Sequence, residues 1–253
     1  MTAGQPKLPL GYRLLYYDSI GSTNDEAMRL ARSGTADRTL VWALEQTAGR
    51  GRRGRTWISP RGNLYLSMIL RPCCTAARAA ELGFVAALGI GAALRALVPR
   101  SERVTYKWPN DVLLNGRKIA GVLLETETGA QTLPDFVVVG VGVNLAVSPG
   151  RTEFPATSIF EEGFCPVPPE TMLAEFTHCF ESWVTTWQSE GFAAVRAAWL
   201  AAAAIRRGEP IHVRAHAHTL SGRFIDIDEG GGLLLDCAEG CRRIAAGEVF
   251  PAA

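Results

Sequence analysis

A segment rich in arginine and glycine, TAGRGRRGRTW (Thr47–Trp57), constrains the fold of this chain more than any other feature. Four arginines and three glycines lie between Gly49 and Arg55. The preceding residues, Arg38–Gln46, read as a strand, and LYLSMIL (Leu64–Leu70) alternates as a strand does. The segment is therefore predicted to be a loop between two strands. It could be a solvated basic loop, a patch that binds nucleic acid, a dinucleotide-binding fingerprint, or a loop that closes over one small anionic ligand.

The glycine spacing of the loop matches a dinucleotide-binding fingerprint, but its surroundings do not. That fingerprint needs a strand before it and a helix after it, so that the pyrophosphate lies at the helix N-terminus. Here a turn and a strand follow instead. An acidic residue is expected about 20 positions further on, where this chain has Pro72, Cys73 and Cys74. These observations argue against a dinucleotide-binding fold.

The charge balance argues against a protein whose main partner is a nucleic acid. The 253 residues include 26 Lys plus Arg and 25 Asp plus Glu, a formal net charge of +1, whereas nucleic-acid-binding domains usually show a clear positive excess. Glycines let backbone N–H groups approach a ligand, and guanidinium groups bind carboxylate or phosphate through paired hydrogen bonds. We therefore favour a loop that binds an anion and becomes ordered around it, with a solvated basic loop as the alternative.

Neither a membrane anchor nor a metal site is predicted. The N-terminus has no apolar stretch of signal-peptide length, and the most apolar run, Phe84–Val98, is interrupted by Arg95 and is too short to span a bilayer. The six cysteines form no CxxC pair and have no histidine at a zinc-like spacing, so no set of metal ligands is assigned. His212, His216 and His218 are interpreted as surface residues. A reduced, cytoplasmic protein is the simplest interpretation.

The hydrophobic pattern predicts alternating strands and helices along most of the chain. We expect strands at 14–20, 38–46, 64–70 and 135–147, helices at 21–34, 76–98, 170–189 and 192–204, and a β-hairpin of 104–114 and 117–128 around an Asn115–Gly116 turn. Thr23 and Glu26 have the spacing of a capping box for the first helix. Beyond residues 204–208 the pattern changes to short strands and glycine turns. We therefore expect two domains, residues 1–205 and residues 206–253, the second a small β-barrel.

Three further segments carry residues of the types found in binding and catalytic sites. KWPND (Lys107–Asp111) combines a cation, an aromatic ring, a proline, an amide and a carboxylate, although the same letters suit a plain turn. RKIAGVLLE (Arg117–Glu125) places Lys118 at a hairpin edge and a glycine inside a strand, which marks either a bulge or the close approach of a ligand. GVGVNLA (Gly140–Ala146) again places glycines in a buried strand.

In this order, DSIGSTND, EQTAGRGRRGRTW, KWPNDV, RKIAGVLLE and GVGVNL closely resemble the biotin–protein ligases, the bacterial holocarboxylase synthetases. The resemblance extends from about Leu14 to Phe250. It implies an α+β fold, with a mixed β-sheet and packed helices shared with class II aminoacyl-tRNA synthetases, plus a C-terminal SH3-like β-barrel. It also implies an enzyme that uses ATP and Mg²⁺ to convert biotin to biotinyl-5′-AMP. The enzyme then transfers biotin to one lysine of a biotin carboxyl carrier protein, of acetyl-CoA carboxylase or a related carboxylase.

The resemblance assigns roles to residues that match the family's motifs. Lys118, Arg50 and Asp111 are expected to be catalytic, with Lys118 at the junction of the biotin carboxylate and the α-phosphate. Biotin is expected to contact Ser22, Thr23, Asn24, Gln46, Arg50, Gly51, Arg52, Lys118, Gly121 and Gly140. ATP and the adenylate are expected to contact Arg52, Arg55, Trp57, Lys107, Asn110, Lys118 and Asn144. Trp57 would flank the adenine, and Asn110 and Asp111 would act on phosphates, Mg²⁺ or the incoming lysine.

Two departures from the family pattern affect these expectations. No N-terminal segment of winged-helix length precedes the first strand, so an enzyme without DNA-binding activity is expected. No basic residue follows Glu248, whereas relatives often carry a C-terminal arginine that faces ATP; either Arg242 or Arg243 substitutes, or the contact is missing. The alternatives are a lipoate–protein ligase-like enzyme and a non-catalytic biotin-binding regulatory module. The chain is expected to be a monomer or a homodimer.

Overall fold

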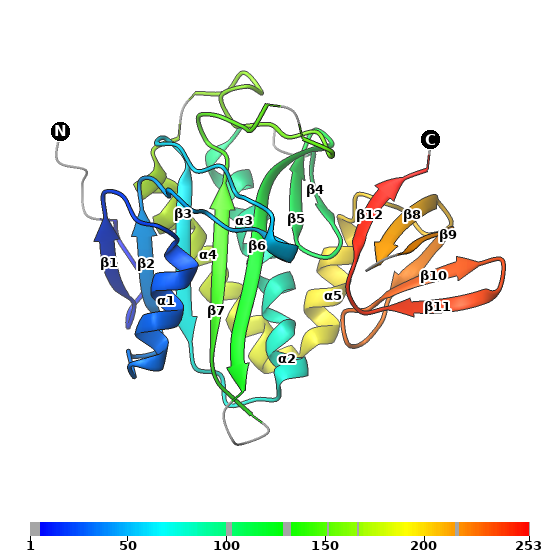
Figure 1. Cartoon of the computed structure of the whole chain (residues 1–253), viewed down its shortest axis with the longest axis horizontal. Coiled ribbons are helices and arrows are strands. Elements are labelled where there is room, and N and C mark those ends of the chain that lie inside the picture. The colour runs from blue at the N-terminus through cyan, green and yellow to red at the C-terminus, as the bar shows by residue number, and fades with distance from the viewer. Residues whose placement is uncertain are drawn as a thin grey trace.

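A computed structural model describes residues 6–99, 103–128, 133–150, 152–165, 167–215 and 218–252. Figure 1 shows a larger unit of strands and helices, with a smaller unit made only of strands beside it. The larger unit contains a seven-stranded sheet in the order β1-β2-β3-β7-β6-β5-β4. Its strands are β1 (Arg13–Tyr17), β2 (Thr39–Ala43), β3 (Leu64–Leu70), β4 (Val104–Lys107), β5 (Asp111–Leu114), β6 (Arg117–Thr128) and β7 (Pro134–Val143). Because β1 and β2 are parallel and the other pairs are antiparallel, the sheet is mixed.

Helices cover both faces of this sheet (Figure 1). They are α1 (Thr23–Arg32), α2 (Ala76–Ala80), α3 (Leu82–Leu97), α4 (Pro169–Glu190) and α5 (Phe192–Ala201). Successive strand residues point to opposite faces, so Val41 and Ile69 pack with Ala27 of α1 while Leu40 and Met68 pack with α3 and α4 on the other face. All residues of β2 and β3 are therefore buried.

The apolar stretch that forms α2 and α3 is the core helix of the larger unit. Residues 76–97 are long and apolar enough to cross a membrane by composition alone, with a mean hydropathy of 1.6. In the structure this stretch packs against α4 and β6, and most of the α3 side chains are buried. The apolar side chains of this stretch are therefore buried in the protein core.

The smaller unit is a five-stranded antiparallel sheet in the order β11-β10-β9-β8-β12. Its strands are β8 (Pro210–Ala215), β9 (His218–Ile227), β10 (Leu233–Cys237), β11 (Gly240–Ile244) and β12 (Glu248–Pro251). It docks on the larger unit through a hydrogen bond of 2.9 Å from Trp108 Nε1 to the Gly231 carbonyl, and through an ion pair of 3.0 Å between Arg196 and Asp226. A mixed sheet with packed helices and a separate SH3-like sheet confirm the predicted α+β class.

Several predicted elements differ in detail from those observed. The first helix begins after Ser22 rather than at a Thr23 cap, because Ser22 has extended backbone and its Oγ accepts from the Asp25 amide. The helix expected at 76–98 is two helices, α2 and α3, which meet at Glu81. The expected hairpin arm 104–114 is itself a hairpin of β4 and β5. The Asn115–Gly116 turn between β5 and β6 is present, with positive φ at both residues.

Close packing of α3 on β4 predicts a destabilising effect of Gly91→Ala. A Cβ atom at Gly91 would overlap the hydroxyl of Tyr106, whose side chain is buried and stacked on Trp199. Alanine favours a helix over glycine by about 1 kcal/mol, but overpacking a core costs about 1–3 kcal/mol. We expect a net loss of unfolding free energy, measured by urea denaturation.

Gly83→Ala in the same helix is the matched control. Its added Cβ would meet only the flexible end of Leu124, at 3.3 Å. Gly83→Ala is expected to keep or slightly raise the stability. Equal stabilities of the two variants would contradict the packing at Gly91.

Candidate active site

A cavity of about 310 Å³ lies where α1, the arginine-rich loop, β6, β7 and the C-terminal sheet meet. Every residue that the resemblance assigned to the site lines this cavity, together with Gly142. The structure thus brings together segments that lie up to about half the chain apart. Other lining residues were not predicted: Arg53, Thr56, Ile58, Val122, Leu123, Val141, Pro149, Thr152, Glu153, Phe154, Ala156, Glu248 and Phe250.

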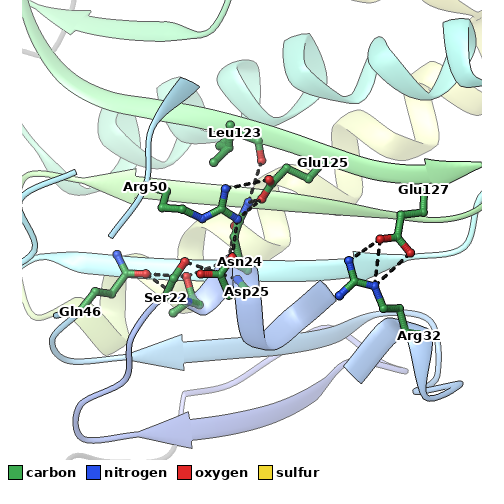
Figure 2. Close-up of polar contacts among 11 residues, drawn as sticks. Ser22, Asn24, Asp25, Arg32, Gln46, Arg50, Leu123, Glu125 and Glu127 are labelled. Carbon is green, nitrogen blue, oxygen red and sulfur yellow. Dashed lines mark hydrogen bonds and ion pairs between the residues drawn. The ribbon is translucent and has the colours of Figure 1, made fainter. Parts of the chain in front are cut away.

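One end of the cavity is polar but largely uncharged. The backbone N–H and the Oγ1 of Thr23 donate to Gln46 Oε1, at 2.8 and 3.0 Å. Gln46 Nε2 donates to Ser59 Oγ at 2.9 Å, and Ser59 Oγ donates to the Trp57 carbonyl at 2.8 Å. Figure 2 shows Gln46 beside Ser22 at the start of α1. This chain of hydrogen bonds fixes the side chains that border the cavity.

Ser67 contacts two residues of this end from outside the cavity lining and was not predicted from the sequence. It is fully buried in β3, and its Oγ lies 2.8 Å from Thr23 Oγ1 and 2.5 Å from Asn24 Oδ1. Its register partner is Gly140 of β7. A Cβ atom at Gly140 would overlap the amide of Asn24. The glycine therefore makes room for Asn24 between the two strands.

Gly121 and Gly142 face each other across β6 and β7 and form a flat surface under Trp57. A Cβ atom would lie 2.6 Å from the indole at Gly142 and 3.2 Å from it at Gly121. The sequence predicts that backbone touches ligand at these glycines, whereas their nearest neighbours here include protein side chains. Contact of Gly121 with biotin, and of Trp57 with adenine, stays a prediction.

Two lysines share one buried carboxylate at the other end of the cavity. Asp111 lies 2.8 Å from Lys107 Nζ and 2.5 Å from Lys118 Nζ. Burial alone would raise the pKa of Asp111, but the charges and hydrogen bonds of Lys118 and Lys107 outweigh it and hold that pKa below its ordinary value. Lys118 Nζ also lies 5.3 Å from the centre of the Trp57 ring. The arrangement holds two ammonium groups in a fixed position beside the cavity.

Arginines of the loop reach the C-terminal sheet at this end. Arg52 donates to Asn110 Oδ1 and to the Gly247 carbonyl, both at 3.3 Å, and Arg55 is paired with Glu248. Burial, and then the charge of Arg53, lower the pKa of the Arg52 guanidinium. The loop therefore bridges the two units across the cavity.

Neither Arg242 nor Arg243, the suggested substitutes for a C-terminal arginine, lines the cavity, which favours the alternative that this contact is missing. Both residues lie on β11, at one edge of the second sheet, whereas the cavity-lining residues Glu248 and Phe250 lie on β12, at the other edge. Arg243 is paired with Asp228 and Arg242 with Glu239. Arg214 of β8 lies closer to the cavity, 4.8 Å over the ring of the lining residue Phe250.

The described residues offer no ready metal site. None of their His, Cys, Asp and Glu side chains form a group of three or more that could hold a metal ion; His216 lies outside these residues. Three carboxylates line the cavity, Asp111, Glu153 and Glu248, and each is paired with lysine or arginine. Mg²⁺ in nucleotide sites is held largely by phosphates and water with one or two carboxylates, so the expected use of Mg²⁺ with ATP stays a prediction.

Comparisons with known proteins agree with the site. Residues 16–144 match the model of the biotin/lipoate A/B protein ligase family, and residues 208–250 match the biotin protein ligase C-terminal domain. The chain is 45% identical to a biotin–[acetyl-CoA-carboxylase] ligase of Paracoccus denitrificans, over 90% of this chain and 96% of that protein. It is 30% identical to the bifunctional ligase/repressor BirA of Bacillus subtilis, over 95% of this chain and 74% of that protein.

Solved structures show the same fold. The biotin protein ligase of Aquifex aeolicus in complex with biotin and ATP has a TM-score of 0.79 and 26% identity, over 94% of this chain and 97% of that chain. The biotin protein ligase of Leishmania major in complex with biotinyl-5-AMP has a TM-score of 0.61 and 27% identity, over 96% and 100%.

The shared carboxylate predicts a large effect of Asp111→Asn on stability. The substitution leaves two ammonium groups together without a counter-charge, and breaking a buried ion pair costs about 3–5 kcal/mol. The pKa of Asp111 in the folded protein lies below 3.8, the ordinary pKa of an aspartate. Its carboxylate therefore stabilises the fold fully at pH values above 3.8, and this stabilisation is lost as the pH falls below 3.8. We expect the difference between wild type and variant to be constant from pH 7 to that value and to shrink below it.

Denaturant unfolding at several pH values measures this difference. Asp236→Asn, at an exposed position of β10, is the matched control and is expected to change the stability little. A loss in Asp111→Asn no larger than in the control would show that the two lysines do not depend on Asp111.

Proposed function

The chain belongs to the biotin protein ligase family and acts as an ATP-dependent biotin–protein ligase, and we propose how its cavity divides the two steps of that reaction. The observation that carries the proposal is the division of the cavity into an uncharged polar end and a cationic end. Six lysines and arginines line it, against three carboxylates. This excess suits a ligand that is neutral at one end and strongly anionic at the other.

The uncharged end is proposed to bind the bicyclic head of biotin. The ureido group of biotin carries two N–H donors and one carbonyl acceptor and has no charge. Thr23, Asn24 and Gln46 offer matching hydroxyl and amide groups, and each is already fixed by a neighbour. Fixed polar groups in a dry site discriminate strongly against a ligand that lacks the matching atoms. This supports biotin over lipoate, whose dithiolane ring has no such donors.

The cationic end is proposed to carry out the first step. The biotin carboxylate attacks the α-phosphorus of ATP, a new C–O–P link forms, and the bond to pyrophosphate breaks. Two anions must meet, so the protein contributes positioning and charge neutralisation. Lys118 lies at this end, where Asp111 keeps it oriented beside Lys107. We assign to Lys118 the contact with the carboxylate and the α-phosphate, and to Arg52 a contact with the phosphates.

In the second step the neutral amine of a carrier lysine attacks the mixed anhydride, and AMP leaves. Biotin ligases act on biotin-carrier proteins, and the Paracoccus relative points to the carrier of acetyl-CoA carboxylase as the acceptor. Water must be kept away from the anhydride, which the loop over the cavity favours. Six free cysteines suit a reducing cytoplasm.

The adenylation step predicts biotin-dependent exchange of labelled pyrophosphate into ATP. We expect exchange with biotin and little with lipoate, measured at equal concentrations with Mg²⁺ present. A protein that binds biotin without catalysing exchange would instead be a regulatory module. Exchange supported equally by lipoate would contradict the proposed role of the uncharged end.

Lys118→Ala is predicted to lower the rate of exchange strongly. Removing one preorganised donor of this kind typically costs about 10²–10³ in rate. The matched control is Lys7→Ala, because Lys7 is exposed and lies outside the cavity. Near-normal adenylation by Lys118→Ala would remove Lys118 from the reaction.

A further inference from the structure

Arg50, the first arginine of the loop, is held by two carboxylates. Its Nη2 lies 2.5 Å from Asp25 Oδ1 and 2.8 Å from Glu125 Oε2, and its Nη1 lies 3.0 Å from Glu125 Oε1. Figure 2 shows the guanidinium between α1, which carries Asp25, and β6, which carries Glu125. Neither carboxylate lines the cavity. The charge of Arg50 is therefore compensated from outside the cavity.

Glu125 also connects Arg50 to the uncharged end of the cavity. Asn24 Nδ2 donates to Glu125 Oε2 at 2.8 Å, while Asn24 Oδ1 accepts from Ser67. The polar contacts thus run from the start of the loop through Glu125 and Asn24 to Thr23 and Gln46. From Gln46 the contacts continue through Ser59 to the carbonyl of Trp57, at the other end of the loop. Both ends of the loop are tied to one network.

The other arginines of the loop have different surroundings. Arg52 donates only to an amide oxygen and a backbone carbonyl among the described residues, and burial lowers the pKa of its guanidinium. The hydrogen bonds of Arg50 with Glu125, and then with Asp25, raise the pKa of Arg50. An incoming anion would meet at Arg52 a guanidinium that makes no hydrogen bond to a carboxylate among the described residues, whereas at Arg50 it would have to replace two carboxylates.

We propose that Arg50 does not bind the biotin carboxylate or a phosphate but forms, with Asp25 and Glu125, a clasp that fixes the start of the loop over the biotin end. Asp25 and Glu125 are then positioning residues, and Arg50 is one as well. This inference rests on the proposed function and replaces the catalytic role that the resemblance gives to Arg50. The anion is left to Lys118 and to Arg52, the loop arginine that contacts only neutral acceptors among the described residues.

The clasp acts on binding more than on the chemical step. A loop that opens more often lets biotin leave and exposes biotinyl-5′-AMP to water. Weakening the clasp should therefore raise the KM for biotin and speed the loss of the intermediate, while the kcat of exchange at saturating biotin changes less. Loss of a contact to the reacting anion would instead lower kcat itself.

A double-mutant cycle distinguishes these roles. We expect Arg50→Gln and Glu125→Gln each to raise the KM for biotin by about tenfold, and the double variant to be little worse than either single variant, because contacting residues couple. If Arg50→Gln lowers kcat by about a hundredfold both in the wild-type protein and in the Glu125→Gln variant, Arg50 contacts the anion and the clasp is wrong. The matched control is the exposed Arg32–Glu127 pair of the same helix and strand (Figure 2), whose cycle should leave the KM unchanged.

Trypsin cleavage within residues 50–55 tests the clasp without any activity. Glu125→Gln should increase cleavage there relative to wild type and to Glu127→Gln, both with and without biotin. Unchanged cleavage would overturn the clasp. A wild-type protein that shows no biotin-dependent exchange would contradict the proposed function, and the cleavage result would still decide the clasp.

Discussion

The ion triplet of Lys107, Asp111 and Lys118 is the interaction on which the rest of the site depends. One buried carboxylate is the counter-charge of two ammonium groups, that of the buried Lys107 and that of the partly exposed Lys118. The three residues come from β4, β5 and β6. The short β4–β5 turn and the Asn115–Gly116 turn make these strands neighbours and so bring the three side chains together. The cavity obtains a positive charge that does not depend on the mobility of a surface loop. The loop arginines add to it from the opposite wall.

Glycines in the central strands set the shape of the cavity. A side chain at Gly140 would expel Asn24, and one at Gly142 would expel the indole of Trp57. The strands themselves are anchored by apolar residues on both faces, so their backbone cannot yield to an added side chain. The same strands therefore supply both the rigid core of the sheet and the floor of the cavity.

The motifs of the chain predict the site well because the residues of the site lie in short segments with distinctive amino-acid sequences. GRGRRG, KWPND and KIAGVLLE each contribute to the cavity, and the strand Leu64–Leu70 has its predicted bounds. Ser67 and Glu125 were missed because each is a single polar residue in an apolar strand, and their importance depends on what faces them across the sheet. Likewise the β-strand order decides that Arg214, and not Arg243, lies near the cavity. Such long-range pairings leave no local signal in the sequence.

The four arginines of the loop are alike in sequence but not in their partners. Arg50 is compensated by Asp25 and Glu125, and Arg55 by Glu248, while Arg53 donates to the backbone at Arg214. Arg52 is the most buried in its surroundings and contacts neutral acceptors only among the described residues. A guanidinium without a counter-charge is costly to bury, and an anionic ligand would remove that cost. The loop therefore combines residues that hold it in place with one residue whose charge is left for a ligand.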